Sequence, residues 1–378
     1  MENSVRRICF LNHCLANGGT DTFVINAAKG LCKRGYDVTV VMAVDDNGKK
    51  HFHEQEALDA GIHVLRTCDL DGIKKKIWHC KKLYKILKEG EYDVFHGNMD
   101  LFNGLNMLVA WFAKVPVRVC HSHNSMSQYE MSTGKHMLVG MYRFVMRRLC
   151  WIFSNRRCGC SELAMDYLFQ RRWENDENSR VIYNGIILEN YRNMNESEIN
   201  KKKKELGVPL DKKIISVVGR IAQQKNPLFI VDMAASLLVR RSDWELVWAG
   251  TGEMQAQVEK NCFKAHVNEK IHMLGSRKDV NEILQCSDIY LMPSVFEGLP
   301  FALIEAQAAG LPCLISDTIS DMVKCGACVS MSLQKSEDEW AETLSDMLDG
   351  KTLVKLDEEK IRKFDVENMV DQLEEVYQ

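Results

Sequence analysis

The sequence predicts an α/β protein of two Rossmann-like domains, each a doubly wound parallel sheet, that face each other across a cleft. The length of 378 residues exceeds what one core of ordinary size accommodates. Both halves run through the same series of short apolar strands separated by helical patterns, which is typical of parallel βαβ units. The halves differ in charge, because residues 1–190 contain 26 Lys and Arg against 21 Asp and Glu, and the remainder contains 23 against 31. We therefore expect two bodies with different partners.

The predicted elements of the two halves correspond in order. The first half opens with a strand at 7–13, a glycine-containing loop at 16–20 and a helical pattern at 23–31. The second opens with a strand at 213–220, a polar loop through Lys225 and a helical pattern at 227–238. Three further pairs of strands follow: 37–42 with 244–249, 93–96 with 288–293, and 115–120 with 311–316. This correspondence predicts one topology for both domains.

The domain boundary is expected after the apolar stretch at 181–188. We predict a first domain over 1–187, a second over 188–363, and a C-terminal helix at 364–378 that could cap either domain, with a return to the first domain as one of the two alternatives. Residues 195–213 are strongly charged and include four consecutive lysines at 201–204, which suits an exposed helix with a solvated face.

The composition excludes several classes of protein. At 46% hydrophobic and 27% charged residues it is that of a soluble globular protein, and no run of 18 apolar residues predicts a membrane span. The 14 cysteines are scattered, and the apolar start lacks the flanks of a signal peptide, so we expect reduced thiols in the cytoplasm. No nucleic-acid-binding module is visible.

Two short motifs resemble metal sites but stand alone. Cys325 and Cys328 form a CxxC pair without a second pair nearby, and Asp69 with Asp71 lies in a loop rather than after an apolar strand. No G-x-G-x-x-G follows the first strand, which argues against a nicotinamide cofactor. We therefore expect neither a metal nor another cofactor.

The most informative stretch runs from Glu297 to Glu305. The turn at 298–300 leads into a helix, with Pro300 in its first turn, where a missing N–H costs nothing. Free N–H groups at a helix start attract an anion. Glu297 would lie beside that site and Glu305 about two turns along the helix. A carboxylate near an anion site suggests a ligand with phosphate and hydroxyl groups, such as a nucleotide sugar.

Two cations flank the loop after the first strand of the second half. Arg220 has a fork geometry suited to phosphate, and Lys225 is a compact point charge. Beside a helix-terminus anion site they would neutralise a leaving diphosphate.

The first half offers its polar residues at the ends of two strands. Gly18 and Gly19 allow either a tight strand-to-helix turn or a close approach of the backbone to a ligand. His121 and His123 end a later strand and point to the same side by alternation. Of the two, His123 is the candidate for a functional role, and a structural role remains open for both.

Three motifs together resemble the retaining glycosyltransferases of family 4, which have the GT-B fold: the Gly219-Arg220 loop with Lys225, the segment from Glu297 to Glu305, and the run at 183–186. The resemblance spans the chain and is strongest over 181–316. It implies transfer of a hexose or N-acetylhexosamine from a nucleotide-diphosphate sugar, most often a UDP-sugar, to a hydroxyl of a glycan or lipid-linked acceptor. The setting it implies is the synthesis of bacterial capsule, exopolysaccharide or glycolipid.

The resemblance also implies a role for each matching residue. Arg220 and Lys225 bind the donor diphosphate, and Glu305 accepts hydrogen bonds from the ribose. His123 and Glu297 face the transferring sugar as the catalytic residues. Further donor contacts are implied for seven backbone positions and one arginine: Gly298, Leu299, Pro300, Phe301, Gly18, Gly19, Gly275 and Arg277. In the first loop Thr20-Asp21 departs from the family, where a small residue and Glu are frequent.

Several alternatives stay open. A sugar-nucleotide 2-epimerase has the same fold but needs further carboxylates, and a non-catalytic subunit that binds sugar nucleotides needs no acceptor. The basic segment around 137–157, rich in arginine and aromatic residues, is either a core helix with a charged edge or a contact with an anionic membrane surface. The second reading implies peripheral attachment at the inner face of the plasma membrane.

Overall fold

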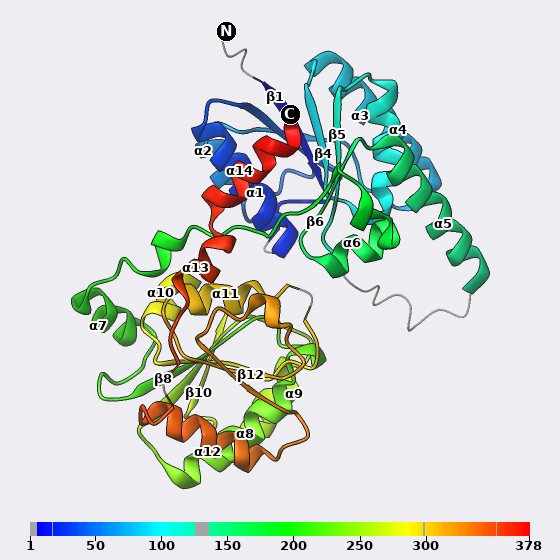
Figure 1. Ribbon diagram of the computed structural model, residues 1–378. Coiled ribbons are helices and arrows are strands. Elements are labelled where there is room, and N and C mark those ends of the chain that lie inside the picture. The colour runs from blue at the N-terminus through cyan, green and yellow to red at the C-terminus, as the bar shows by residue number, and fades with distance from the viewer. Residues whose placement is uncertain (1–5, 17, 125–135, 298, 353) are drawn as a thin grey trace. The chain divides into compact units, whose positions relative to one another are not determined.

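The computed structural model describes residues 6–16, 18–124, 136–297, 299–352 and 354–378. The chain divides into two compact units, the first comprising Met1–Ile186 with Lys363–Gln378 and the second comprising Ile187–Arg362 (Figure 1). Each unit is built on its own sheet, and all the strand pairs in both sheets are parallel. The prediction of two doubly wound parallel-sheet domains is therefore confirmed.

The sheet of unit 1 has seven strands in the order β3-β2-β1-β4-β5-β6-β7. Its strands are β1 (Arg7–Asn12), β2 (Asp37–Met42), β3 (His63–Arg66), β4 (Val94–Gly97), β5 (Val117–Ser122), β6 (Arg156–Gly159) and β7 (Ser179–Val181). The central strands β1 and β4 are almost entirely buried, as expected for strands covered on both faces.

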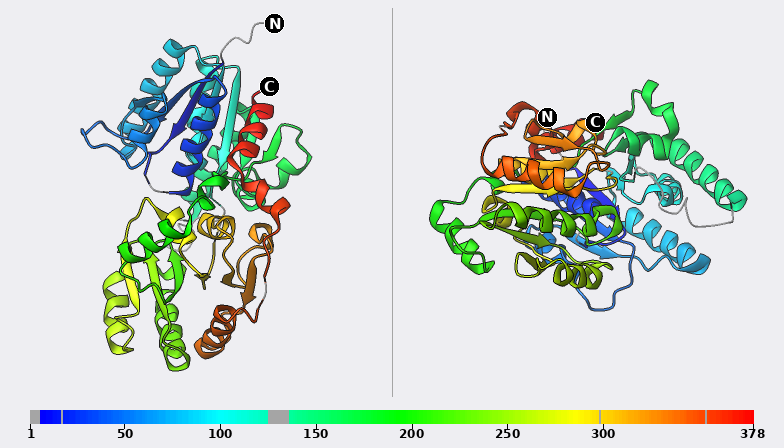
Figure 2. Two further views of the ribbon diagram at one scale, coloured as in Figure 1. Left: turned by 90° about the vertical axis from the view of Figure 1, so that its left-hand side faces the viewer. Right: turned by 90° about the horizontal axis from the view of Figure 1, so that it is seen from below.

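Helices cover both faces of this sheet. They are α1 (Gly19–Lys33), α2 (Glu54–Asp59), α3 (Gly72–Gly90), α4 (Asn103–Phe112), α5 (His136–Phe153), α6 (Glu162–Phe169) and α14 (Val366–Tyr377). Side chains from α3, α4, α5 and α6 share one core cluster with the sheet, whereas α1 and α14 pack together (Figures 1 and 2).

The C-terminal helix α14 is held to α1 by close packing at Gly30 and by the ion pairs of Arg34. A Cβ at Gly30 would lie 2.5 Å from Cγ2 of Val370, so only glycine permits this packing. Arg34 at the end of α1 forms ion pairs with Glu367, Asp371 and Glu374 of α14. The last segment of the chain therefore completes unit 1.

The sheet of unit 2 has six strands in the order β10-β9-β8-β11-β12-β13. They are β8 (Lys213–Val218), β9 (Trp244–Ala249), β10 (Ile271–Gly275), β11 (Ile289–Met292), β12 (Cys313–Ser316) and β13 (Cys328–Met331). The first five strands of each unit follow the same order in space. The predicted correspondence between the halves is thus confirmed in the topology.

The helices of unit 2 are α7 (Glu196–Glu205), α8 (Pro227–Arg240), α9 (Gln255–Lys264), α10 (Val280–Gln285), α11 (Phe301–Ala308), α12 (Glu337–Leu348) and α13 (Glu358–Ile361). Pro227 begins α8, where its missing N–H is harmless, and a capping box of Ser336 with Glu339 begins α12. The larger core of this unit joins α8, α9 and α12 to the sheet, and a smaller cluster lies under α7 and α10.

Three details differ from the sequence-based expectation. Helix α1 begins at Gly19, inside the predicted loop, and Glu305 lies only one turn into α11. Lys202, one of the four lysines expected on a solvated face, is buried and pairs with Glu205, Asp279 and Glu282. A buried ammonium requires such partners, so this lysine joins α7 to the neighbouring α10 segment.

Among the described residues, no helix combines the length and the apolar character that crossing a membrane requires.

Replacing Trp340 by alanine is expected to lower the free energy of unfolding of unit 2 by about 3–5 kcal/mol. The ring is fully buried in α12, lies edge-on to Phe229 at 5.4 Å, and its Nε1–H donates to the Ser332 carbonyl at 3.1 Å. Urea unfolding followed by circular dichroism measures the loss. The matched control Phe263→Ala removes an aromatic ring that is 67% exposed and is expected to change stability by less than about 0.5 kcal/mol. Equal effects of the two substitutions would contradict the assignment of this core.

Candidate functional site

The predicted site residues fall into two sets, one in each unit. In both units the residues follow the carboxyl ends of central strands, which is where ligands bind in open α/β sheets. In unit 2 they follow β8, β10 and β11, and in unit 1 they follow β1 and β5.

Lys225 and Glu297 form a close ion pair in unit 2. Lys225 Nζ lies 2.6 Å from Glu297 Oε1, with side chains 14% and 8% exposed. Gln224 donates from Nε2 to the second carboxylate oxygen at 3.2 Å and to the Phe296 carbonyl at 3.0 Å. The Glu297 carboxylate therefore holds the loop after β8 to the loop after β11. It also places an acceptor directly beside the Lys225 cation.

Glycines after β8 and β9 make this arrangement possible. Gly219 has φ +135°, and a Cβ there would lie 2.7 Å from Lys225 Cε. Gly250 has φ +153°, and a Cβ there would lie 2.0 Å from the Gly219 carbonyl oxygen. The positive φ favours glycine at both positions, and at Gly250 the contact with backbone also excludes a side chain.

Arg220 and Arg277 differ in what holds them. Arg220 is exposed and forms no ion pair with any residue that the structure describes, so its guanidinium is available to an anion. Arg277 pairs with Glu205 and Asp279, and its charge is already neutralised. Gly275, at the end of β10, has φ +68° and hydrogen-bonds to Gly250 through its carbonyl at 2.8 Å. The Arg277 guanidinium and the Gly275 carbonyl thus both have partners within unit 2.

The start of α11 offers fewer N–H groups than expected. Pro300 has none, and the N–H of Phe301 is donated to the Leu299 carbonyl at 3.0 Å. Gly298 lies outside the described residues. Of the N–H groups expected to meet an anion, that of Phe301 is thus already donated, because a tight turn precedes the helix.

Glu305 is held by a residue that the motif did not indicate. The hydroxyl of Tyr191 donates to Glu305 Oε1 at 2.7 Å. Burial raises the pKa of Glu305, and the hydrogen bond from Tyr191 opposes that rise. A buried carboxylate with a second oxygen to spare is suited to accept hydrogen bonds from a ligand hydroxyl.

In unit 1, Asp21 has a structural role at the start of α1. Its carboxylate accepts from the Gly18 N–H at 3.1 Å and from Asn12 Nδ2 at 2.8 Å. A Cβ at Gly18 would lie 2.9 Å from Asp21 Oδ2. The residue that departs from the family pattern thus caps the helix, while Gly18 and Gly19 remain exposed.

The tautomer of His123 follows from its partner Asn98. Asn98 Nδ2 faces two carbonyls, those of Leu11 and His96, each at 3.3 Å. Because both are acceptors, Asn98 Oδ1 must face His123 Nε2, 2.9 Å away. His123 therefore donates from Nε2–H, which leaves Nδ1 as an unprotonated acceptor. Nδ1 is buried and has no partner among the described residues.

His123 is the last member of a buried row of rings. It stacks on His121 at 4.3 Å, and His121 Nδ1 lies 3.0 Å from His96 Nε2. His96 Nδ1 in turn lies 2.9 Å from the hydroxyl of Tyr377, in α14. Burial lowers the pKa of all three histidines, and that of His123 falls to about 3. These rings are neutral at physiological pH, and His121 is fully buried between His96 and His123.

Asp100 fixes the chain that leaves β5. Its Oδ1 accepts from the backbone N–H of His123 at 2.9 Å and from that of Asn124 at 3.3 Å. Burial raises the pKa of this carboxyl, and these hydrogen bonds oppose the rise. Asp100 has φ +44°, a left-handed conformation that is uncommon for a residue with a side chain. This conformation directs its carboxylate to the backbone at His123.

The motifs that resembled metal sites are engaged elsewhere. Asp69 accepts from the Asp45 N–H and pairs with Lys75, and the Cys328 thiol donates to Gln307. No cluster of potential metal ligands occurs in the part of the chain that the structure describes.

Asn98, Asp100, Tyr191 and Gln224 were not anticipated from the sequence. Asn98 and Asp100 follow β4 within three residues, so the rule for carboxyl ends of parallel strands would have found them. Tyr191 lies more than 100 positions before its partner Glu305, and no local pattern announces such a contact.

Substituting Asn98 by aspartate is expected to raise the pKa of His123, because a carboxylate at Nε2 stabilises the imidazolium. In the unaltered chain the ring stays neutral from pH 7 to pH 5, with the proton on Nε2. Nitrogen-15 NMR of the imidazole reports both the tautomer and the titration. Asn47→Asp adds the same charge on an exposed loop and is expected to leave His123 unchanged. A proton on Nδ1 would overturn the assignment.

Comparisons with known proteins agree with this geometry. A family model described as glycosyl transferases group 1 matches residues 198–363, and one described as Glycosyltransferase Family 4 matches residues 17–190. EpsF from Bacillus subtilis is 30% identical over 348 residues, covering 91% of this chain and 88% of the relative. The UDP-Gal:alpha-D-GlcNAc-diphosphoundecaprenol alpha-1,3-galactosyltransferase of Escherichia coli is 30% identical over 250 residues, covering 62% of this chain and 60% of the relative.

Among solved structures, HepE of Anabaena in complex with UDP-glucose superposes with a TM-score of 0.79 over 98% of both chains, at 17% identity. This likeness shows the GT-B fold. Together with the matching family models and the relative that is 30% identical along most of its length, it assigns the chain. The protein belongs to the group 1, family 4 glycosyltransferases and is a sugar-transferring enzyme.

Proposed function

We propose that the enzyme transfers a hexose or N-acetylhexosamine from a nucleotide-diphosphate sugar, namely a UDP-sugar, to a hydroxyl of a glycan or lipid-linked acceptor in bacterial polysaccharide or glycolipid synthesis. The observation that carries the proposal is the Lys225–Glu297 pair beside the unpaired Arg220, with Glu305 in the same unit. These residues combine cations for a diphosphate with carboxylates for hydroxyls. The Escherichia coli relative, named for UDP-Gal and a diphosphoundecaprenol-linked acceptor, and the HepE complex with UDP-glucose support a UDP-linked donor, and the first also supports a lipid-linked acceptor.

The donor diphosphate is assigned to Arg220 and Lys225. Arg220 has no competing partner among the described residues and can bind phosphate oxygens in a bidentate manner. Lys225 is shared with Glu297, so a bound diphosphate would lie opposite that carboxylate across one ammonium group. Glu305, held by Tyr191, accepts hydrogen bonds from the ribose with its remaining oxygen.

The transferring sugar is assigned to Glu297 and His123. Glu297 accepts a hydrogen bond from a sugar hydroxyl while Lys225 holds it in place. His123 Nδ1, an acceptor without a partner among the described residues, is suited to accept from a sugar hydroxyl. Asn98 and Asp100 position His123 from its ring and its backbone.

The reaction requires stabilisation of a leaving group more than acid–base chemistry. The bond between the anomeric carbon and the diphosphate oxygen breaks, a bond to the acceptor oxygen forms, and the acceptor's hydroxyl proton passes to the departing diphosphate. Cations aimed at the diphosphate stabilise the charge that develops there. Retention of the anomeric configuration is proposed from the family pattern.

Transfer is proposed to need no metal, since Arg220 and Lys225 supply the positive charge that a divalent ion would bring. Activity is therefore expected to survive exhaustive treatment with EDTA, measured as release of the nucleoside diphosphate. Lys225→Ala in the same assay tests the contribution of this cation. We expect it to lower activity by about 100-fold or more, in line with removing one charge-stabilising group. Loss of activity to EDTA that Mn²⁺ restores would overturn the metal-free assignment.

Replacing Glu305 by alanine is expected to weaken nucleotide-sugar binding by roughly 10- to 100-fold, because a hydrogen bond to a charged group contributes about 1.5–3 kcal/mol. Calorimetric titration with a panel of nucleotide sugars measures the loss and identifies the base. Tyr191→Phe is expected to have a smaller effect in the same direction, since it releases the carboxylate without removing it. The exposed Glu269→Ala serves as control. Unchanged affinity in Glu305→Ala with a native circular dichroism spectrum would refute the ribose assignment.

Attachment at an anionic membrane is part of the proposal. Helix α5 carries Arg143, Arg147 and Arg148 and no acidic residue, and Met141 and Phe144 are more than 60% exposed. A helix with cations and exposed apolar side chains suits the surface of an anionic bilayer. A lipid-linked acceptor would be found there.

A further inference from the structure

Exposed apolar side chains are concentrated on three adjacent helices of unit 1. Of the nineteen exposed large hydrophobic residues in the described part of the chain, eleven lie on α3, α4 and α5. They are Ile73, Ile77, Trp78, Tyr84, Trp111, Phe112, Met141, Tyr142, Phe144, Val145 and Ile152. Large contiguous apolar surface is rare on soluble proteins unless a ligand or partner covers it.

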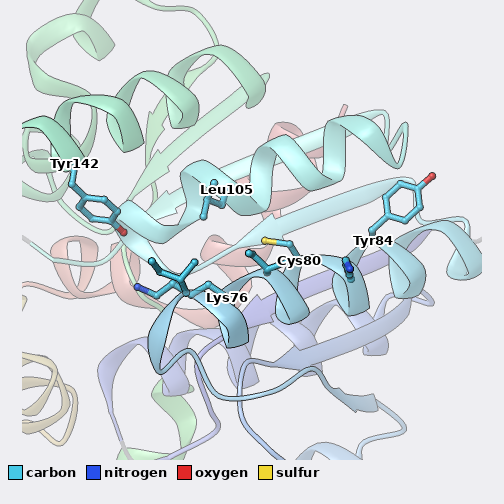
Figure 3. A pocket seen from close by; sticks show the side chains of 8 residues that line it. Lys76, Cys80, Tyr84, Leu105 and Tyr142 are labelled. Carbon is cyan, nitrogen blue, oxygen red and sulfur yellow. The ribbon is translucent and has the colours of Figure 1, made fainter.

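Part of this surface is hollowed into a groove, named here the α3–α5 groove. It has a volume of about 740 Å³ and is lined by Ile73, Ile77, Cys80 and Tyr84 of α3, Leu105 of α4 and Tyr142 of α5, with Lys76 and Lys81 also in its lining. Figure 3 shows side chains from the three helices along it. Its volume falls in the range of sites that hold small organic ligands.

The helices around the groove carry an excess of positive charge. Helix α3 contains seven lysines and one acidic residue, α5 contains three arginines and none, and α4 is uncharged. Lys75 is neutralised by Asp45 and Asp69, but Lys74 and Lys81 form no ion pair with any described residue. The groove is thus apolar inside with unpaired cations around it, which favours an amphiphile with an anionic head.

We propose that the α3–α5 groove binds the isoprenoid chain of a lipid-diphosphate-linked acceptor, with the surrounding lysines facing its diphosphate. This inference rests on the proposed function, which requires an acceptor. An isoprenoid diphosphate matches both properties of the groove, since its tail is apolar and its head carries the charge. A second copy of the chain placed on the same face would bring the cations of the two copies together, which disfavours that occupant.

The test measures equilibrium binding of farnesyl diphosphate to the full chain, with inorganic diphosphate as the head-group control. Farnesyl diphosphate is expected to bind at least about tenfold more tightly than inorganic diphosphate, a difference of about 1.4 kcal/mol. Leu105→Trp fills the groove and Ile77→Asp places a charge in it. Each substitution is expected to remove the tenfold preference for farnesyl diphosphate over inorganic diphosphate. The double variant Lys76→Ala, Lys81→Ala is expected to weaken the binding of farnesyl diphosphate, because it removes two cations while the groove stays apolar.

Matched controls place the same groups elsewhere. Val239 is 86% exposed on α8 of unit 2, so Val239→Trp and Val239→Asp repeat both substitutions outside the groove and are expected to change nothing. Circular dichroism and the thermal midpoint verify that each variant is folded. If Leu105→Trp is misfolded, Ile77→Asp, at a side chain that is 53% exposed, carries the test.

Three outcomes overturn the proposal. One is equal affinity for inorganic and farnesyl diphosphate, and another is binding that the groove variants do not change. The third is sedimentation with phosphatidylglycerol vesicles that Leu105→Trp abolishes while farnesyl diphosphate does not bind, since the surface would then be a bilayer contact. Failure of the proposed function has a different signature: nucleotide sugars would not bind, while farnesyl diphosphate would still occupy the groove.

Discussion

The parallel arrangement of the strands is the constraint on which the rest of the structure depends. A parallel sheet is covered by helices on both faces, so its strands are largely apolar and groups that bind ligands are expected where the strands end. In this chain Lys225, Glu297, Asn98 and His123 all occupy such ends. Because the topology is the same in both units, two candidate residues follow corresponding strands: Asn98 follows β4 and Glu297 follows β11.

Neighbouring side chains determine the position of Lys225 and the protonation of His123. Glu297 forms an ion pair with Lys225, which holds the lysine in place and partly neutralises its charge. Asn98 determines which nitrogen of His123 carries the proton, because two carbonyls fix the orientation of its amide. In the second case a residue outside the predicted motifs decides which nitrogen of His123 can accept a hydrogen bond.

The surface of unit 1 adds a feature that the donor motifs do not contain. Helices α3, α4 and α5 cover the sheet with one face and leave many apolar side chains exposed on the other, among lysines and arginines. The two kinds of surface suit two different substrates. A polar set at strand ends suits a nucleotide sugar, whereas an apolar groove with cations suits a lipid-linked substrate.

The sequence by itself determined the two parallel-sheet units, their shared topology and the family, since apolar strand patterns and turn motifs are local properties. It also indicated Lys225, Glu297, Glu305 and His123 as candidates. Only the tertiary structure decided that Tyr191 holds Glu305, that Lys202 is buried, that Arg277 is neutralised and that α14 completes unit 1. These contacts join residues far apart in the chain, and no local pattern encodes which side chains meet when distant segments pack.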